Sequence, residues 1–246
     1  MAAERHLEHA PIKEAIIDFR VILPEKVTIE DLDRGFTALE SDYPNRSELT
    51  QGSFGIRIDK GQTVSTSMEQ SIEGYRYASA DGTQVVQFRS NGFTFSRLEP
   101  YLTWEQMKEE AERLWSIFVE YAKPQKIVRV ATRYINVMPI PLPFSEFDNV
   151  LTAPPQIPDG LPQGVSSFIT RIVSRNNDID ATAIVTQAFD TIDNNRAPIT
   201  LDIDVFADKE FLPEESAFWD YLEQLRIFKN EIFFKSITEE TAELFE

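Results

Sequence analysis

The 246-residue chain contains no cysteine and only 2 histidines. The lack of cysteine excludes disulfides, zinc–thiolate sites, iron–sulfur clusters and thiol nucleophiles. His6 and His9 both lie near the N-terminus, and no G-x-S-x-G elbow accompanies them. We therefore expect these histidines to be solvent-exposed residues of a loose terminus, without a catalytic role.

Phosphate-binding loops and long apolar runs are also missing. Neither G-x-x-x-x-G-K-[ST] nor G-x-G-x-x-G occurs, and no run of about 18 apolar residues could span a membrane. The first residues do not combine a basic region with an apolar one, so we expect no secretory signal. These absences predict a soluble cytoplasmic protein that has no cofactor and no contact with a membrane.

Positive charge is scarce. The chain has 24 Lys+Arg against 41 Asp+Glu, a formal charge of −17. This excess argues against direct binding to nucleic acid or to anionic lipid, because both need clustered Lys and Arg. Like-charge repulsion that keeps the protein in solution is one interpretation. The other is an acidic face that meets a basic partner, and segment 202–223, with eight acids and one lysine, is its best candidate.

Hydrophobic periodicity predicts a mixture of strands and helices. In the first half we expect a strand over 12–23, a helix capped by Thr28 and short strands at 54–59, 72–79 and 84–89. Hairpin turns at 81–82 and 91–92 and a long helix over 103–122 follow from the same pattern. In the second half we expect a strand at 126–138 ended by Pro139, a short helix within 143–150, strands at 165–175, 181–189 and 198–206, and a helix over 213–235.

The two halves resemble each other. At an ungapped offset of 115, Leu23-Pro24 aligns with Met138-Pro139, and Trp104-Glu105 aligns with Trp219-Asp220. We therefore predict two α+β pseudo-repeats, residues 1–123 and 124–246, fused into one structural domain. The second includes a proline-rich loop at 139–162, which holds seven of the 14 prolines.

Each half, read as strand, helix, antiparallel strands and long helix, resembles the unit of the TATA-binding-protein-like fold. That resemblance implies one curved antiparallel sheet with helices on one face and the first strands of the two units side by side at its centre. Strands 12–23 and 127–138 would then be antiparallel neighbours. Glu14 would face Arg133, and Asp18 would face Arg129, so that opposite charges fix the register.

Two short motifs carry a second resemblance. Residues 10–20 read APIKEAIIDFR, and residues 133–136 read RYIN. Their order and spacing are similar to those of a sporadically distributed family of uncharacterised prokaryotic proteins. The resemblance implies a bacterial protein of mobile-element or defence gene sets. It supplies no activity and no catalytic residues.

The best candidate site lies on the two strands that carry these motifs. Arg129 and Arg133 share one face of their strand, and Tyr134 and Asn136 share the other. Arginine offers a forked donor to carboxylate or phosphate. We therefore predict a ligand-binding site from both strands, made of Glu14, Asp18, Arg20, Arg129, Arg133, Tyr134 and Asn136. The alternative is that the arginines form internal salt bridges with Glu14 and Asp18.

Asp202 and Asp204 are weaker candidates for a metal site. Both project from one face of a strand, and a third acid could complete a Mg²⁺ or Mn²⁺ site. We prefer to interpret them as the solvated face of an edge strand. A second feature is a possible aromatic sheet face of Tyr75, Tyr77, Phe93 and Phe95, which could stack bases or grip a peptide but is more typical of packing under a helix.

The sequence favours a binding or adaptor protein over an enzyme. We expect it to be the partner of another protein in a bacterial mobile-element, toxin–antitoxin or phage-defence set. One alternative is a phosphate- or nucleotide-processing enzyme that uses Arg129, Arg133 and the two aspartates. Another is an acidic mimic of nucleic acid that binds a basic protein. The sequence identifies neither the partner nor the oligomeric state.

Overall fold

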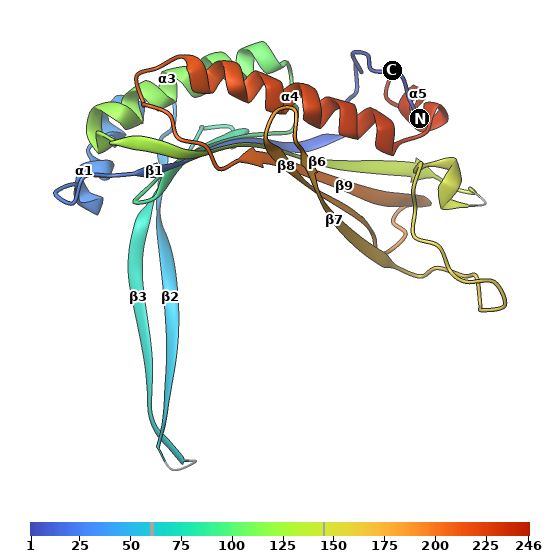
Figure 1. The fold of residues 1–246 in the computed structure, drawn as a ribbon, viewed down its shortest axis with the longest axis horizontal. Helices are drawn as coiled ribbons and strands as arrows, with labels where there is room; N and C mark the ends of the chain where they lie inside the picture. The colour runs from blue at the N-terminus through green and yellow to red at the C-terminus, as the bar shows by residue number, and fades with distance from the viewer. Residues whose placement is uncertain (60–61, 145) are drawn as a thin grey trace.

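A computed structural model describes residues 1–59, 62–144 and 146–246. Their strands form one open, antiparallel, nine-stranded sheet in the order β2-β3-β4-β5-β1-β6-β9-β8-β7. Helices cover one face of this arched sheet and leave the other bare (Figure 1). The predicted α+β class, with one antiparallel sheet and helices on one face, is therefore confirmed.

The elements follow one another in a similar order in the two halves. The first half contains β1 (Ile12–Ile22), α1 (Ile29–Asp33), α2 (Phe36–Leu39), β2 (Asn45–Asp59), β3 (Gln62–Ala78), β4 (Gln84–Arg89), β5 (Gly92–Leu98) and α3 (Trp104–Ala122). The second half contains β6 (Lys126–Pro141), a 3₁₀ turn at Phe147–Asn149, β7 (Phe168–Asn176), β8 (Ala181–Phe189), β9 (Arg196–Ala207), α4 (Ala217–Ser236) and α5 (Glu239–Glu243).

β1 and β6 pair antiparallel at the centre of the sheet, as predicted. Their register differs from the expected one by two residues, because Glu14 lies opposite Ile135 and Asp18 lies opposite Ala131. A shift of two leaves every side chain on its original face of the sheet. The hydrophobic pattern therefore could not distinguish the two registers, and the direct pairs of Glu14 with Arg133 and of Asp18 with Arg129 are wrong.

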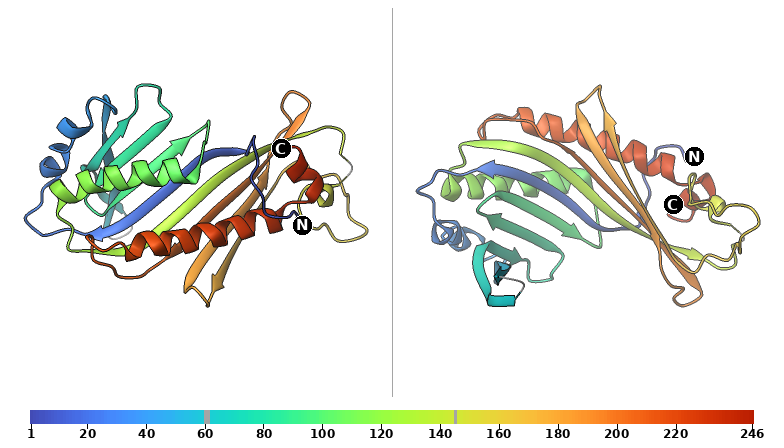
Figure 2. Two further views of the ribbon diagram at one scale, coloured as in Figure 1. Left: turned by 90° about the horizontal axis from the view of Figure 1, so that it is seen from above. Right: turned by 60° about the horizontal axis from the view of Figure 1, so that its bottom comes forward.

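The core lies between the sheet and the two long helices, α3 and α4, which run along its upper face (Figures 1 and 2). Phe19, on β1, is fully buried at the middle of this layer. Its ring contacts Trp115 of α3 and Phe218 of α4, each at 5.2 Å between centroids. The aromatic face predicted from the sequence packs here too, because Tyr75, Tyr77, Phe93 and Phe95 are all buried in the core.

Several element boundaries differ from those predicted. β6 continues past Pro139 to Pro141, since Pro139 lies opposite Pro198 and neither residue has an N–H to donate. The helix expected after Thr28 divides into α1 and α2 at Gly35, where a Cβ would come within 2.9 Å of the Phe88 ring. The short strands expected in residues 45–79 instead form a long two-stranded ribbon, β2–β3, which projects from the sheet (Figure 1).

The N-terminal segment is held against α4 and α5. The Ala2 amide donates to the carbonyls of Phe234 and Ile237, each at 3.0 Å, and the His9 amide donates to the carbonyl of Phe245 at 2.9 Å. His6 and His9 are exposed, as predicted, but the terminus is not loose. Within the described residues, no helix has the length and apolar character that crossing a membrane requires.

Replacing Phe19 by alanine tests the role of this central ring. We expect Phe19→Ala to lower the free energy of unfolding by about 3 to 5 kcal/mol, because the cavity would open beneath both helices. Ile22→Ala on the same strand, where the side chain is 42% exposed, is the matched control and should cost less than about 1 kcal/mol. Urea unfolding followed by circular dichroism measures both, and equal losses would contradict the assignment.

Candidate functional site

The predicted site residues of β6 divide between the two faces of the sheet. Arg129 and Arg133 lie on the helix-free face, and Tyr134 and Asn136 lie on the face that the helices cover. Both pairs therefore occur as the alternation of the strand predicted. They therefore belong to two different sites, one on each face of the sheet.

Asp18 is the centre of the charged cluster on the helix-free face. Its carboxylate lies 2.5 Å from Arg89 Nη2, 3.2 Å from Arg129 Nη1 and 3.4 Å from Arg20 Nε. The Thr94 hydroxyl donates to it at 2.7 Å. Arg89 comes from β4, and no local pattern in the sequence indicates it, because its position beside Asp18 depends on the order of the strands.

The second part of the cluster joins β6 to β9. Arg133 forks onto Asp202, with Nε–Oδ1 at 2.8 Å and Nη2–Oδ2 at 2.6 Å. Arg129 Nη2 lies 3.6 Å from Asp204 Oδ2, and its guanidinium stacks over the Phe206 ring at 4.3 Å. The internal salt bridges that the sequence left open therefore exist, with Asp202 in place of Glu14 as the partner of Arg133.

The two aspartates of β9 share one face, as predicted, and both carboxylates are engaged by arginine. Burial raises the pKa of Asp204, and the nearby Arg129 and Arg133 oppose this rise. Within residues 1–59, 62–144 and 146–246, no group of three or more acidic or histidine side chains is placed to hold a metal ion. The edge-strand interpretation is wrong, because β9 lies between β6 and β8.

Arginine is concentrated on the helix-free face. Residues directly opposite each other in a sheet point to the same side, so the register follows each row of side chains across the strands. Eight arginines of the described strands lie on this face, together with four carboxylates, an excess of 8 − 4 = 4 arginines on a chain of charge −17. The arginines are Arg20, Arg76, Arg89, Arg129, Arg133, Arg171, Arg175 and Arg196, and the carboxylates are Glu14, Asp18, Asp202 and Asp204.

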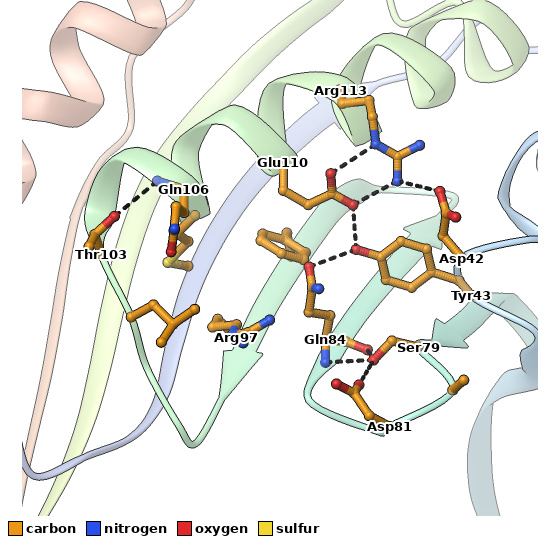
Figure 3. Close-up of a pocket in the computed structure, with 14 residues that line it drawn as sticks. Asp42, Tyr43, Ser79, Asp81, Gln84, Arg97, Thr103, Gln106, Glu110 and Arg113 are labelled. Atoms are coloured by element: carbon orange, nitrogen blue, oxygen red, sulfur yellow. Dashed lines mark hydrogen bonds and ion pairs between the residues drawn. The ribbon is translucent and has the colours of Figure 1, made fainter.

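A cavity of about 680 Å³ lies beside α3 and the β3–β4 turn (Figure 3). Tyr43 donates to Glu110 Oε1 at 2.6 Å and lies 3.0 Å from Gln84 Oε1. Arg113 forks onto Glu110 at 2.7 and 2.8 Å. Burial, with the hydrogen bond to Glu110 second, raises the pKa of Tyr43. These groups satisfy one another, so we interpret the chain of contacts as one that fastens α3 to the sheet.

A second cavity, of about 700 Å³, lies under the N-terminal segment and is bounded by α3, α4 and β6. Lys229 of α4 lines it and is only 7% exposed. Its ammonium lies 3.6 Å from the centre of the Tyr134 ring and makes no hydrogen bond or ion pair with the described residues. Burial lowers the pKa of Lys229 to about 7; Arg226 adds to this effect and Glu4 opposes it.

Tyr134 and Asn136 form part of the wall of this second cavity. The Tyr134 hydroxyl lies 3.1 Å from that of Tyr101, and burial raises the pKa of Tyr134. Asn136 Nδ2 donates to the carbonyl of Leu201 at 2.9 Å. Glu223 connects α3 to α4 at the edge of this cavity, because its carboxylate accepts from Trp104 Nε1 and from Arg226 Nη1, each at 2.6 Å.

Helical spacing in the sequence marks Lys229. Lys229 follows Leu222 by seven positions and Leu225 by four, so it lies on the apolar face of the predicted helix. A lysine at such a position is either buried or reaches past its neighbours to solvent. Here it is buried.

Comparisons with known proteins add no family. No protein-family model matches the chain. No curated protein matches it either. The resemblance of the 10–20 and 133–136 motifs to an uncharacterised prokaryotic family therefore stays a prediction.

Removal of the charge at the centre of the arginine cluster should destabilise the fold. We expect Asp18→Asn to lower the free energy of unfolding by about 2 to 4 kcal/mol, because Arg20, Arg89 and Arg129 would lose their common partner. Asp208→Asn, at an exposed position outside the cluster, should stay within about 0.5 kcal/mol of the wild type. Urea unfolding at low salt measures the free energy of unfolding of both variants. An equal loss in both would contradict a central role of Asp18 in the cluster.

The buried lysine predicts an unusual pH dependence. Below about pH 7, Lys229 is protonated in both the folded and the unfolded chain, so Lys229→Met should stabilise the protein most. Between that pH and the ordinary value of 10.5, the unfolded chain binds a proton that the folded chain does not, so wild-type stability should rise relative to the variant. The expected slope is about 1.4 kcal/mol per pH unit. Urea unfolding of both proteins at two pH values in this window measures it, and parallel pH profiles would contradict the lowered pKa.

Proposed function

We propose that the protein is a non-enzymatic binding or adaptor protein that holds an acidic segment of another protein on its helix-free face. The observation that carries this proposal is the concentration of eight arginines on that face of a strongly acidic chain. Complementary charge steers the encounter between two proteins and fixes their orientation. An arginine fork also matches the geometry of a partner carboxylate.

Two arginines of the cluster, Arg20 and Arg133, remain within reach of solvent, whereas Arg89 and Arg129 are only 18% and 21% exposed. The side chains of Arg20 and Arg133 are 41% and 44% exposed, whereas those of Asp18 and Asp202 are 15% and 17% exposed. The carboxylates thus lie lower in the face and the guanidinium groups lie above them. Such fixed donors lose less side-chain entropy when a ligand binds than free ones would.

The acidic segment 202–223 gives less support to a basic partner or to mimicry of nucleic acid. Asp202 and Asp204 lie next to arginines of β6, Glu210 pairs with Lys126 at 2.6 Å, and Glu223 pairs with Arg226 at 2.6 Å. Half of its eight acids therefore already have a partner cation in the same chain. The enzyme alternative meets the same obstacle, because Asp202 already occupies the fork of Arg133.

We further infer that the sheet is built from two related units, as in the TATA-binding-protein-like fold. The support is the position of Ile17 directly opposite Thr132 in the central pair of strands, since these residues are 115 apart, the offset that aligns the two halves. The order of strands on either side is also similar, although β2 has no counterpart in the second half. A shared fold does not carry function. The adaptor role in a mobile-element or defence set follows from the motif resemblance alone.

Capture from the native host with a charge-reversed face tests the binding proposal. Arg76→Glu combined with Arg171→Glu changes two arginines of the helix-free face that lie outside the central cluster. We expect the wild type to retain a stoichiometric partner protein and the double variant to lose it, since about four units of charge are changed. Native mass spectrometry measures the stoichiometry, and binding of the purified partner should weaken with salt.

The matched control reverses the same number of charges on the helices that cover the other face of the sheet, with Lys108→Glu on α3 combined with Lys235→Glu on α4. This variant should keep the partner. Loss of the partner from both variants, or from neither, would contradict a docking site on the helix-free face. Recovery of nucleic acid in place of a protein would contradict the assigned class of partner.

A further inference from the structure

Lys229 is placed where it destabilises the folded chain. A buried ammonium without a carboxylate partner loses its hydration, and the face of the Tyr134 ring at 3.6 Å replaces only part of it. Leucine or methionine at this position of α4 would avoid that loss. A residue that lowers stability in the core and yet opens onto a cavity is typical of a binding or catalytic site.

The surroundings of Lys229 contribute little counter-charge. From α4, Arg226 faces it with a second positive charge, which is already paired with Glu223. From the N-terminal segment, Glu4 opposes the lowering of the Lys229 pKa, but its carboxylate accepts from Asn230 Nδ2 at 3.1 Å and makes no ion pair with Lys229. Glu8 and Glu105 also line the cavity, and in the part of the chain that the structure describes neither pairs with Lys229. The remaining polar groups of the wall include His6, Tyr101, Tyr134 and Asn136, none of which is an anion at neutral pH.

We propose that this second cavity binds a small organic carboxylate with an aromatic or apolar body, whose carboxylate pairs with the ammonium of Lys229. The anion would supply the ion-pair partner that Lys229 lacks among the described residues. This ligand would be bound independently of the protein partner on the helix-free face, because helices α3 and α4, which bound the cavity, lie on the opposite face of the sheet (Figure 1).

The residues that line the cavity favour a ligand with an aromatic or apolar body. The cavity volume of about 700 Å³ lies within the range of small-molecule sites. Aromatic rings from α3, β6, α4 and the loop before α3 line it, namely Tyr101, Trp104, Tyr134, Phe233 and Phe234. Flat apolar ligands bury their faces well against such rings. A purely inorganic anion would pair with Lys229 but would leave this apolar surface uncovered.

The first test uses matched probes. Phenylacetate and 1-naphthaleneacetate carry an aromatic body and a carboxylate, and their amides have the same shape without the charge. We expect each acid to bind the wild-type protein roughly 10- to 100-fold more tightly than its amide, as measured by isothermal titration calorimetry, because only the acid forms a charge-assisted pair. Lys229→Met should reduce the affinity for the acids by a similar factor and leave that for the amides unchanged.

The second test measures proton uptake when the ligand binds. Near pH 8, Lys229 is mostly neutral in the free protein, and an anion that pairs with it draws a proton from the buffer. Titrations in buffers of different ionisation enthalpy should therefore show uptake of about one proton per bound acid. His6 and Glu4, which also face the cavity, remain in the Lys229→Met variant, where the uptake should disappear.

Lys235→Met provides a control at an exposed lysine of the same helix and should bind the acids like the wild type. Because Lys229→Met is expected to be more stable than the wild type near neutral pH, its loss of binding could not be attributed to unfolding. Equal affinity for acids and amides, acid binding that survives Lys229→Met, or no binding of either acid would each overturn the proposal.

Discussion

The antiparallel pairing of β1 with β6 is the interaction on which the rest of the molecule depends. It joins the two halves of the sheet, so that strands from both halves form one continuous layer. On the upper face of that layer it places Phe19 between α3 and α4, and on the lower face it brings Asp18 within 3.2 Å of Arg129. A change in this register would alter the core and the charged cluster together.

Local pattern predicted the elements well, and long-range partners poorly. The alternation in residues 12–22 and the 3.6-residue spacing in α3 result from burial of one face, which a single sequence records directly. The pairing of Arg133 with Asp202 depends on which strand lies beside β6, and that order is a property of the whole sheet. The β2–β3 ribbon was predicted as shorter strands, because its polar sequence has few regularly alternating apolar residues to mark its length.

Positively charged side chains have different surroundings on the two faces of the sheet at β6. Arg133 points to the helix-free face, where the chain provides Asp202 and water reaches the guanidinium. The next residue, Tyr134, points to the covered face, where its ring meets an ammonium without an anion. Because consecutive residues of a strand point to opposite sides, one short segment contributes to both environments.

These environments differ in what a ligand would have to do. A partner carboxylate on the helix-free face must compete with Asp18 or Asp202 for arginines that are already paired, so the energy gained per contact is small and many contacts are needed. In the cavity, a single carboxylate meets the ammonium of Lys229, which has no ion-pair partner among the described residues. The free energy of binding then includes recovery of the desolvation cost that the buried ammonium carries without a ligand. The open face is therefore suited to a large, weakly held surface, and the cavity to a small ligand.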